Sequence, residues 1–121
     1  MGERTEPDRL DAAALGVDRL GRRATLVHFS SAFCRPCRAT RLVLAEVAGL
    51  VEGVRHVDVD AESRLGLVRA LGITRTPTVL ILAADGRIVR RATGRPRKAE
   101  VIAALGAAVS EERTPRSEDR T

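Results

Sequence analysis

One short apolar segment followed at once by a helical pattern constrains the fold of this chain more than any other feature. Residues 25–29 read Thr-Leu-Val-His-Phe. Two arginines precede this segment and two serines follow it, a pattern typical of a buried strand. From residue 34 to about residue 50 the apolar side chains instead recur at helical spacing. The sequence therefore predicts a central strand leading into a helix, and that helix opens at Cys34 and Cys37.

The following segments continue this alternation and predict a mixed sheet. Residues 54–60 alternate apolar and polar side chains, and residues 65–71 return to helical spacing. Residues 78–82 form an apolar strand, Asp85-Gly86 is a strong hairpin signal, and residues 87–91 supply an antiparallel return strand.

Helices are also predicted at both ends of the folded region. Asp8 or Asp11 could cap a short first helix, which Gly16 weakens. Residues 99–109 form a closing amphipathic helix. Its predicted apolar face consists of Val101, Ile102, Leu105 and Val109. The predicted fold class is α/β, with a central mixed sheet flanked by helices in the order (α)βαβαββα.

The length of 121 residues suits one domain with frayed ends. Residues 1–10 and 110–121 are too polar to offset the entropy of ordering, so both are predicted to be disordered tails around a domain of residues 11–109. Hydrophobic residues make up 44% of the chain, but the only aromatic residues are Phe29 and Phe33. The core must therefore be aliphatic.

The net charge of +5 does not indicate a nucleic-acid-binding protein. The densest basic run, residues 87–98, has no aromatic side chain that could stack a base, and we interpret it as a solvated face. The N-terminus lacks an apolar leader core, and no segment approaches the roughly 20 apolar residues of a membrane span. We therefore expect a soluble, cytoplasmic monomer that binds neither nucleic acid nor membrane.

The spacing of the two cysteines is the sequence feature that indicates a chemical function. In a reducing compartment, such a pair is redox-active or metal-binding rather than a structural staple. At a helix start, free N–H groups and the helix dipole stabilise a thiolate, so Cys34 is the predicted nucleophile. Cys37, one turn deeper, would resolve a mixed disulfide. Pro36 is tolerated in the first helical turn, and Arg35 adds positive charge.

Several short motifs across residues 24–109 resemble the thioredoxin family. They are Leu26-Val27-His28-Phe29, Phe33-Cys34-Arg35-Pro36-Cys37, Gly72-Ile73, Thr76-Pro77-Thr78, Gly86 and Gly94. The resemblance implies a cofactor-free thiol–disulfide oxidoreductase of cell redox homeostasis. Its substrates would be protein disulfides or small thiols, and a thioredoxin-reductase-like enzyme would donate electrons. It also implies a cis Pro77 that faces the cysteines, with the backbone of Thr76 pairing with the substrate.

The surface around the cysteines departs from the family's usual pattern. Ser30 and Phe33 occupy positions usually held by tryptophan, and Arg35 replaces a glycine. The predicted substrate-binding residues are Phe33, Arg35, Pro36 and Thr76. We therefore expect an altered substrate surface.

His28 is the largest departure, because thioredoxins generally carry a buried aspartate behind the second cysteine. An imidazole with an ordinary pKa near ~6.5 could accept the proton of that cysteine, or it could be a neutral buried ring. His56 could approach His28, but a solvent-facing strand position is the simpler interpretation. Asp58 and Asp60 are interpreted as solvated strand-end residues.

Two other functions remain as alternatives. Cys34, Cys37, His28 and His56 together have the number and type of ligands that a structural zinc prefers. The histidines lie on separate strands, however, so we predict no metal. A redox-inert interaction module on the same fold is the second alternative, and the two intact cysteines argue against it.

Overall fold

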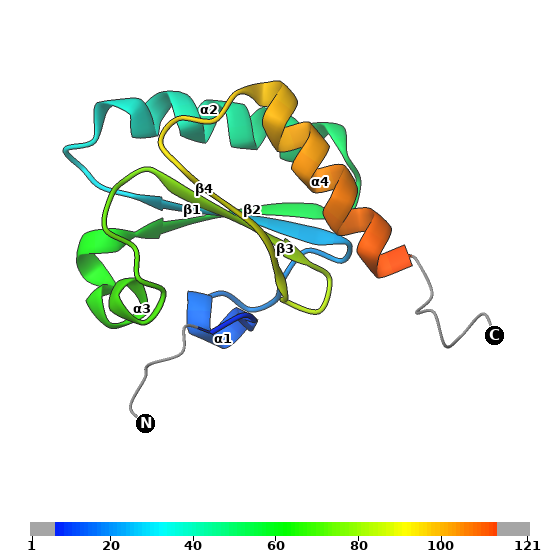
Figure 1. The fold of residues 1–121 in the computed structure, drawn as a ribbon, viewed down its shortest axis with the longest axis horizontal. Helices are drawn as coiled ribbons and strands as arrows, with labels where there is room; N and C mark the ends of the chain where they lie inside the picture. The colour runs from blue at the N-terminus through cyan, green and yellow to red at the C-terminus, as the bar shows by residue number, and fades with distance from the viewer. Residues whose placement is uncertain (1–6, 114–121) are drawn as a thin grey trace.

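The computed structural model describes residues 7–113 of the chain and confirms the predicted fold class (Figure 1). The helices are α1 (Ala12–Leu15), α2 (Arg35–Leu50), α3 (Leu65–Ala70) and α4 (Lys98–Arg113), with a 3₁₀ turn, η1 (Ala61–Ser63), before α3. The strands are β1 (Ala24–Ser30), β2 (Val54–Asp60), β3 (Thr78–Ala83) and β4 (Ile88–Thr93). This order agrees with the order predicted from the alternating patterns.

The four strands form one mixed sheet in the order β2-β1-β3-β4. β1 runs parallel to β2 and antiparallel to β3, and β3 pairs antiparallel with β4. The turn at Asp85-Gly86 makes the last pairing possible, because Gly86 has a φ of 91°. Its N–H donates to the carbonyl oxygen of Ala83 at 2.9 Å. A Cβ atom there would also lie 2.2 Å from the carbonyl oxygen of Leu10, so only glycine fits.

Helices cover both faces of the sheet, and each face has its own core (Figure 1). α2 and α4 lie on one face, and α1 and α3 lie on the other. The core under α2 and α4 includes Ala24, Leu26, Leu44, Val47, Val79, Ile81 and Leu105. The core under α1 and α3 includes Leu15, Val27, Phe29, Val57, Val59, Leu71, Leu80 and Leu82. As predicted from the composition, aliphatic side chains fill most of both cores.

The prediction of a disordered tail over residues 1–10 is wrong for its last three residues. Leu10 is only 4% exposed, and its N–H donates to the carbonyl oxygen of Gly86 at 2.9 Å. The N–H of Ile88 donates to the carbonyl oxygen of Asp8 at 2.9 Å. Residues 8–10 are held in place by hydrogen bonds to the distant β3–β4 turn. Their own local sequence, which is mostly polar, gives no sign of these contacts. Residues 1–6 lie outside the described part of the chain.

The first and last helices also differ from their predictions. Asp11 caps α1, which ends after four residues at Gly16, where φ is 76°. In α4, Ile102 is 45% exposed rather than part of the apolar face. The helix also continues to Arg113, beyond the predicted tail boundary at residue 110, consistent with the helix propensity of Glu and Arg. The remainder of the predicted C-terminal tail, residues 114–121, lies outside the described residues.

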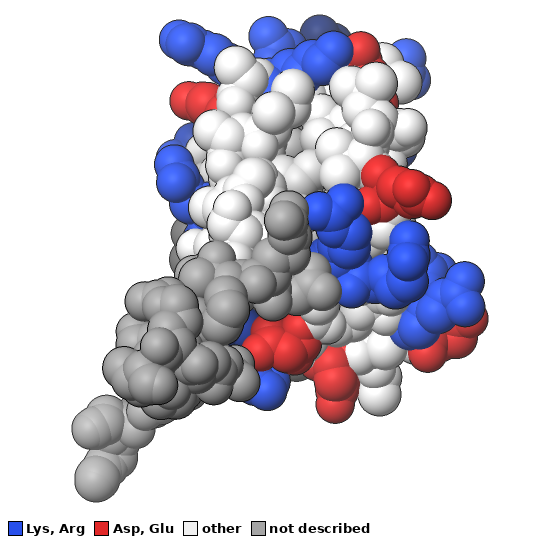
Figure 2. All heavy atoms as spheres, turned by 90° about the vertical axis from the view of Figure 1, so that its right-hand side faces the viewer, with Lys and Arg blue, Asp and Glu red and all other residues white. Residues whose placement is uncertain are grey.

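The end of the molecule opposite the start of α2 combines uncharged and basic surface (Figures 1 and 2). An uncharged area occupies the upper half of this end, with basic side chains along its top and more of them gathered below it on the right (Figure 2). Arg19, Arg22 and Arg55 line a hollow at the start of β2. The basic side chains of the protein are therefore not confined to the surface around the two cysteines. Among the described residues, no helix is long and apolar enough to cross a membrane.

Candidate active site

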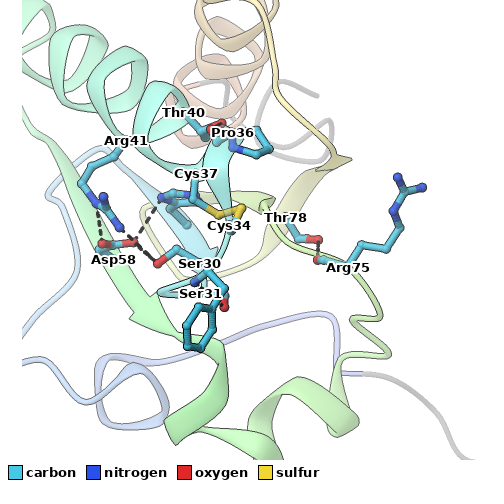
Figure 3. The surroundings of a disulfide bond; sticks show 12 residues. Ser30, Ser31, Cys34, Pro36, Cys37, Thr40, Arg41, Asp58, Arg75 and Thr78 are labelled. Atoms are coloured by element: carbon cyan, nitrogen blue, oxygen red, sulfur yellow. Dashed lines mark hydrogen bonds and ion pairs between the residues drawn. A yellow bond between two sulfur atoms is a disulfide. The ribbon is translucent and has the colours of Figure 1, made fainter.

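The two cysteines form a disulfide where β1 leads into α2 (Figure 3). Cys34 is the N-cap of α2, Pro36 lies in its first turn, and the Cα atoms of the two cysteines are 5.3 Å apart. Cys37 is only 1% exposed, whereas Cys34 is partly exposed. One sulfur atom can therefore meet a substrate, while the other approaches it from inside the fold.

The Thr76–Pro77 peptide bond is cis and precedes β3, whose first residue lies beside the end of β1 that leads to the cysteines. β3 begins directly after it, and Thr78 pairs in register with Phe29 near the end of β1. Thr78 Oγ1 donates to the carbonyl oxygen of Arg75 at 2.6 Å across this dipeptide, and Figure 3 shows Thr78 on the disulfide side of Arg75. Pro77 is buried and Thr76 is partly exposed. The structure therefore brings this loop and the cysteine pair together.

The surface around Cys34 is open and basic. A cavity of about 550 Å³ adjoins the disulfide. It is lined by Ser31, Ala32, Phe33, Cys34, Arg35, Cys37, Arg38 and Arg41. Phe33 is 87% exposed, and Arg35 and Pro36 are also exposed. Three of the four predicted substrate-binding side chains thus lie on the surface beside the disulfide.

A polar cluster lies on the α2 side of β1 and β2. His28 is fully buried, and its Nδ1 atom is 3.1 Å from Oδ1 of Asp58. The other carboxylate oxygen, Oδ2, accepts a hydrogen bond from Nε of Arg41 at 2.8 Å. Ser30 Oγ donates to Oδ1 at 3.1 Å. Figure 3 shows Asp58, Arg41 and Ser30 joined by these contacts near Cys37. The Asp58 carboxylate is therefore held from two sides.

His56 belongs to the same cluster, so its interpretation as a solvent-facing residue is wrong. Its ring stacks against that of His28, with centroids 6.3 Å apart and planes 26° apart. Asp58 is exposed to solvent as interpreted, with 35% of its side chain accessible, but its carboxylate also contacts His28, Ser30 and Arg41. The parallel register pairs Leu26 with His56 and His28 with Asp58, so alternate residues of both strands share one face. Asp60, by contrast, caps η1.

Both imidazoles are neutral at pH 7. Burial lowers the pKa of His28 to about 4, although the Asp58 carboxylate opposes this shift and His56 and Arg41 add to it. Burial also lowers the pKa of His56, again with Asp58 opposing the shift and Arg41 adding to it. A neutral imidazole can accept a proton or bind a metal ion. The site therefore holds two neutral nitrogen ligands or bases beside one carboxylate.

Sequence reasoning missed Asp58, Arg41 and Ser30 as members of the site. Arg41 follows Cys37 by four residues, which places both on one side of a helix. Asp58 lies between two buried valines in an alternating strand, which places it on the opposite face from them. These periodicities were visible in the sequence. The pairing of β1 with β2 brings these residues together, and the periodicity of each segment does not predict that pairing.

The mixed sheet and the disulfide at a helix start define a thioredoxin-like α/β protein, with a cysteine pair that supports thiol–disulfide oxidoreductase chemistry. The Thioredoxin family model matches residues 17–107. A thioredoxin from Mycolicibacterium smegmatis is 32% identical over 100 residues, which cover 79% of this chain and 88% of the relative. The chain belongs to the thioredoxin family.

Solved thioredoxin structures share the fold. A mutant thioredoxin from Halobacterium salinarum has a TM-score of 0.67 at 20% identity, covering 73% of this chain and 76% of that chain. Thioredoxin from Fasciola hepatica has a TM-score of 0.64 at 22% identity, with coverages of 73% and 83%. Oxidised mitochondrial thioredoxin 3 from Saccharomyces cerevisiae has a TM-score of 0.63 at 17% identity, with coverages of 71% and 79%. At these identities the likeness concerns the fold alone.

Proposed function

We propose that this chain exchanges its Cys34/Cys37 dithiol with substrate disulfides through a mixed disulfide at Cys34. The observation that supports this most is the unequal burial of the two cysteines across one disulfide. The Cys34 thiolate attacks a substrate sulfur, forming one S–S bond and releasing the other substrate sulfur as a thiolate. Cys37 then attacks Cys34 Sγ, which restores the Cys34–Cys37 disulfide and frees the second substrate thiol.

His28 is the proposed proton acceptor for Cys37. Cys37 must lose its proton before it can attack, and it is buried where bulk water cannot readily take that proton. His28 is neutral at pH 7, and the Asp58 carboxylate beside Nδ1 stabilises the imidazolium that proton transfer creates. In this proposal the histidine and a neighbouring carboxylate replace the buried aspartate usual in the family.

The substrates are protein disulfides or small thiols that bind against Phe33, Arg35, Pro36 and Thr76. Pro77 shapes this surface from the opposite side of the disulfide. We place the chain in the cytoplasm as a monomer that uses no cofactor and receives electrons from a thioredoxin-reductase-like enzyme. The exposed ring of Phe33 and the guanidinium of Arg35 suit contact with a partner, since neither makes a described contact that would occupy it.

Trapping the mixed disulfide tests the exchange mechanism. The reduced Cys37→Ser variant should accumulate a covalent adduct with disulfide-bonded insulin or a small disulfide, because resolution is blocked. The Cys34→Ser variant should form no such adduct and should show only background turnover. Mass spectrometry of the adduct identifies the bonded sulfur. A Cys34→Ser variant as active as the parent would overturn the proposal.

Single-turnover kinetics test His28 separately from the exchange itself. Formation of the mixed disulfide at Cys34 should proceed normally in His28→Leu, because this step does not need the proton of Cys37. Its resolution should be slower, and His28→Asp, which restores the residue usual in the family, should recover part of the rate. Equal resolution rates in the parent and His28→Leu would remove His28 from the mechanism while leaving the roles of the cysteines intact.

A further inference from the structure

Three buried imidazole nitrogens lack hydrogen-bond partners within residues 7–113. They are Nδ1 and Nε2 of His28 and Nε2 of His56. Buried polar atoms in folded proteins are nearly always paired, and an unpaired one often marks a position that water or an ion fills. His28 is fully buried, so bulk solvent does not satisfy its two nitrogens. Residues 7–113 therefore leave these nitrogens of the polar cluster without a partner.

The arrangement of these atoms indicates the chemistry of that partner. One ligand atom from each of His28, His56 and Asp58 lies within 4.8 Å of the others. Nδ1 of His28 and Oδ1 of Asp58 are only 3.1 Å apart, yet they do not meet the geometry of a hydrogen bond. Two acceptor atoms that bind the same cation are also separated by about this distance, since metal–ligand bonds are ~2.0–2.2 Å long.

We propose that His28, His56 and Asp58 form a binding site for a divalent zinc-like cation. Two imidazoles and one carboxylate are a known ligand set for zinc sites that keep a coordination position open for water. The site goes beyond the proposed exchange reaction and does not depend on it.

The residues around the cluster determine how a cation would reach the site and how tightly it would bind. β2 is an edge strand of the sheet, and the side chain of Asp58 is 35% exposed, so a cation can enter from this edge. Arg41 contacts Oδ2 and leaves Oδ1 directed at the histidine, which is how outer-shell partners orient ligating carboxylates. Its positive charge also repels the cation, so we expect weaker binding than at a structural zinc site.

The cation site is distinct from a zinc site built on the cysteines. In the oxidised protein both sulfur atoms are held in the Cys34–Cys37 disulfide and no thiolate is present to ligate zinc. The proposed site needs neither sulfur. Zinc binding by the oxidised protein therefore separates the two possibilities in one measurement.

The test is calorimetric titration of Zn²⁺ into the full-length, oxidised, chelator-treated protein. We expect one bound ion per chain. The near-isosteric Asp58→Asn and the partly buried His56→Gln should each weaken binding by more than the ~10–100-fold loss typical of removing an outer-shell partner. Asp85→Asn, at the exposed β3–β4 turn, is the matched control and should bind as the parent does. Circular dichroism verifies that each variant is folded.

Co²⁺ absorption provides a second readout that depends on the ligands themselves. The bound ion should show a visible spectrum typical of nitrogen and oxygen ligands, without a sulfur charge-transfer band. No binding to the oxidised parent, or equal binding by the parent and both site variants, overturns the proposal. Binding that appears only after reduction and disappears in Cys37→Ser assigns the metal to the sulfurs and also overturns it. The adduct-trapping experiment, performed with a chelator, remains an independent test of exchange.

Discussion

The two faces of β1 and β2 are built from neighbouring residues but have opposite chemistry. On the α3 side, Val27, Phe29, Val57 and Val59 are all buried in an apolar core. On the α2 side, His28, His56 and Asp58 form a polar cluster. Deeper on that same side, Ala24 and Leu26 are again buried and apolar. The polar residues are therefore confined to the end of the face where α2 and the cysteines begin.

This difference separates a face that stabilises the fold from one that supports the site. A buried, unpaired polar group costs about 1–3 kcal/mol, whereas a buried aliphatic or aromatic side chain contributes a similar or larger amount in the opposite direction. Functional sites are where a sequence departs from the arrangement that stability alone would favour. Substitutions on the two faces should therefore change the free energy of unfolding in opposite directions.

The largest effect should come from the apolar face. Phe29→Ala should lower the free energy of unfolding by about 3–5 kcal/mol, because it removes a fully buried ring and leaves a cavity. Urea denaturation measures the change. Phe33→Ala is the matched control on the same residue type, because Phe33 is 87% exposed; its stability should change by less than about 0.5 kcal/mol. Similar losses in both variants would mean that Phe29 is not a core residue.

The polar face should make stability depend on pH. The pKa of His28 is about 4 in the folded state and 6.5 in the unfolded state. Above pH 6.5 both states are neutral; between pH 6.5 and 4 only the unfolded state binds a proton, so stability falls as the pH falls. The total loss should be about 3 kcal/mol. His56, whose pKa is also lowered, acts in the same direction.

Urea denaturation from pH 7.5 to 4, with a chelator present, measures this dependence. The parent should lose more stability over this range than His28→Leu, which lacks the titrating ring. The difference between the two proteins removes the contributions of other groups, such as Asp18, whose pKa is lowered chiefly by its hydrogen bond with Arg55. Parallel pH curves would show that His28 is not buried in its neutral form.

The elements of the fold were predictable because their patterns are local. The alternation of Val57 and Val59 with polar residues predicted β2, and Asp85-Gly86 predicted the turn between β3 and β4. The cysteine spacing likewise located the disulfide at the start of α2. Each of these signals lies within a few residues of the structure that it predicts.

The missed features depend on contacts between distant segments. Leu10 is buried because its backbone meets Gly86, and the polar residues before it give no sign of this partner. Asp58 reaches His28 only because β1 and β2 pair in one particular register. A shift of one residue would place Asp58 on the opposite face. Strand periodicity identifies the face of a strand, but it does not identify the neighbour across the sheet.

A smaller effect, opposite in sign to that of Phe29→Ala, should follow from His28→Leu. Leucine fills a similar volume and has no polar atom, so the free energy of unfolding at pH 7.5 should rise by about 1 kcal/mol. Urea denaturation measures this gain, and the resolution rate of the mixed disulfide should fall in the same variant. A stability loss of the size seen for Phe29→Ala would show that the imidazole is satisfied in solution and would remove the contrast between the faces.

The smallest effect on stability should come from Arg41, which joins α2 to the polar face. Its ion pair with Asp58 is partly exposed, with 44% and 35% of the two side chains accessible, so Arg41→Gln should cost less than about 1 kcal/mol. Its electrostatic effect should nevertheless be visible, because Arg41 lowers the pKa of both histidines. Removing its positive charge should therefore raise both pKa values, which NMR titration of the imidazoles in the presence of a chelator can measure.

Lys98→Gln breaks the comparably exposed pair with Glu46 and serves as the control, because neither histidine pKa is lowered by Lys98. Equal histidine pKa values in these two variants would show that the charge of Arg41 does not reach the polar face.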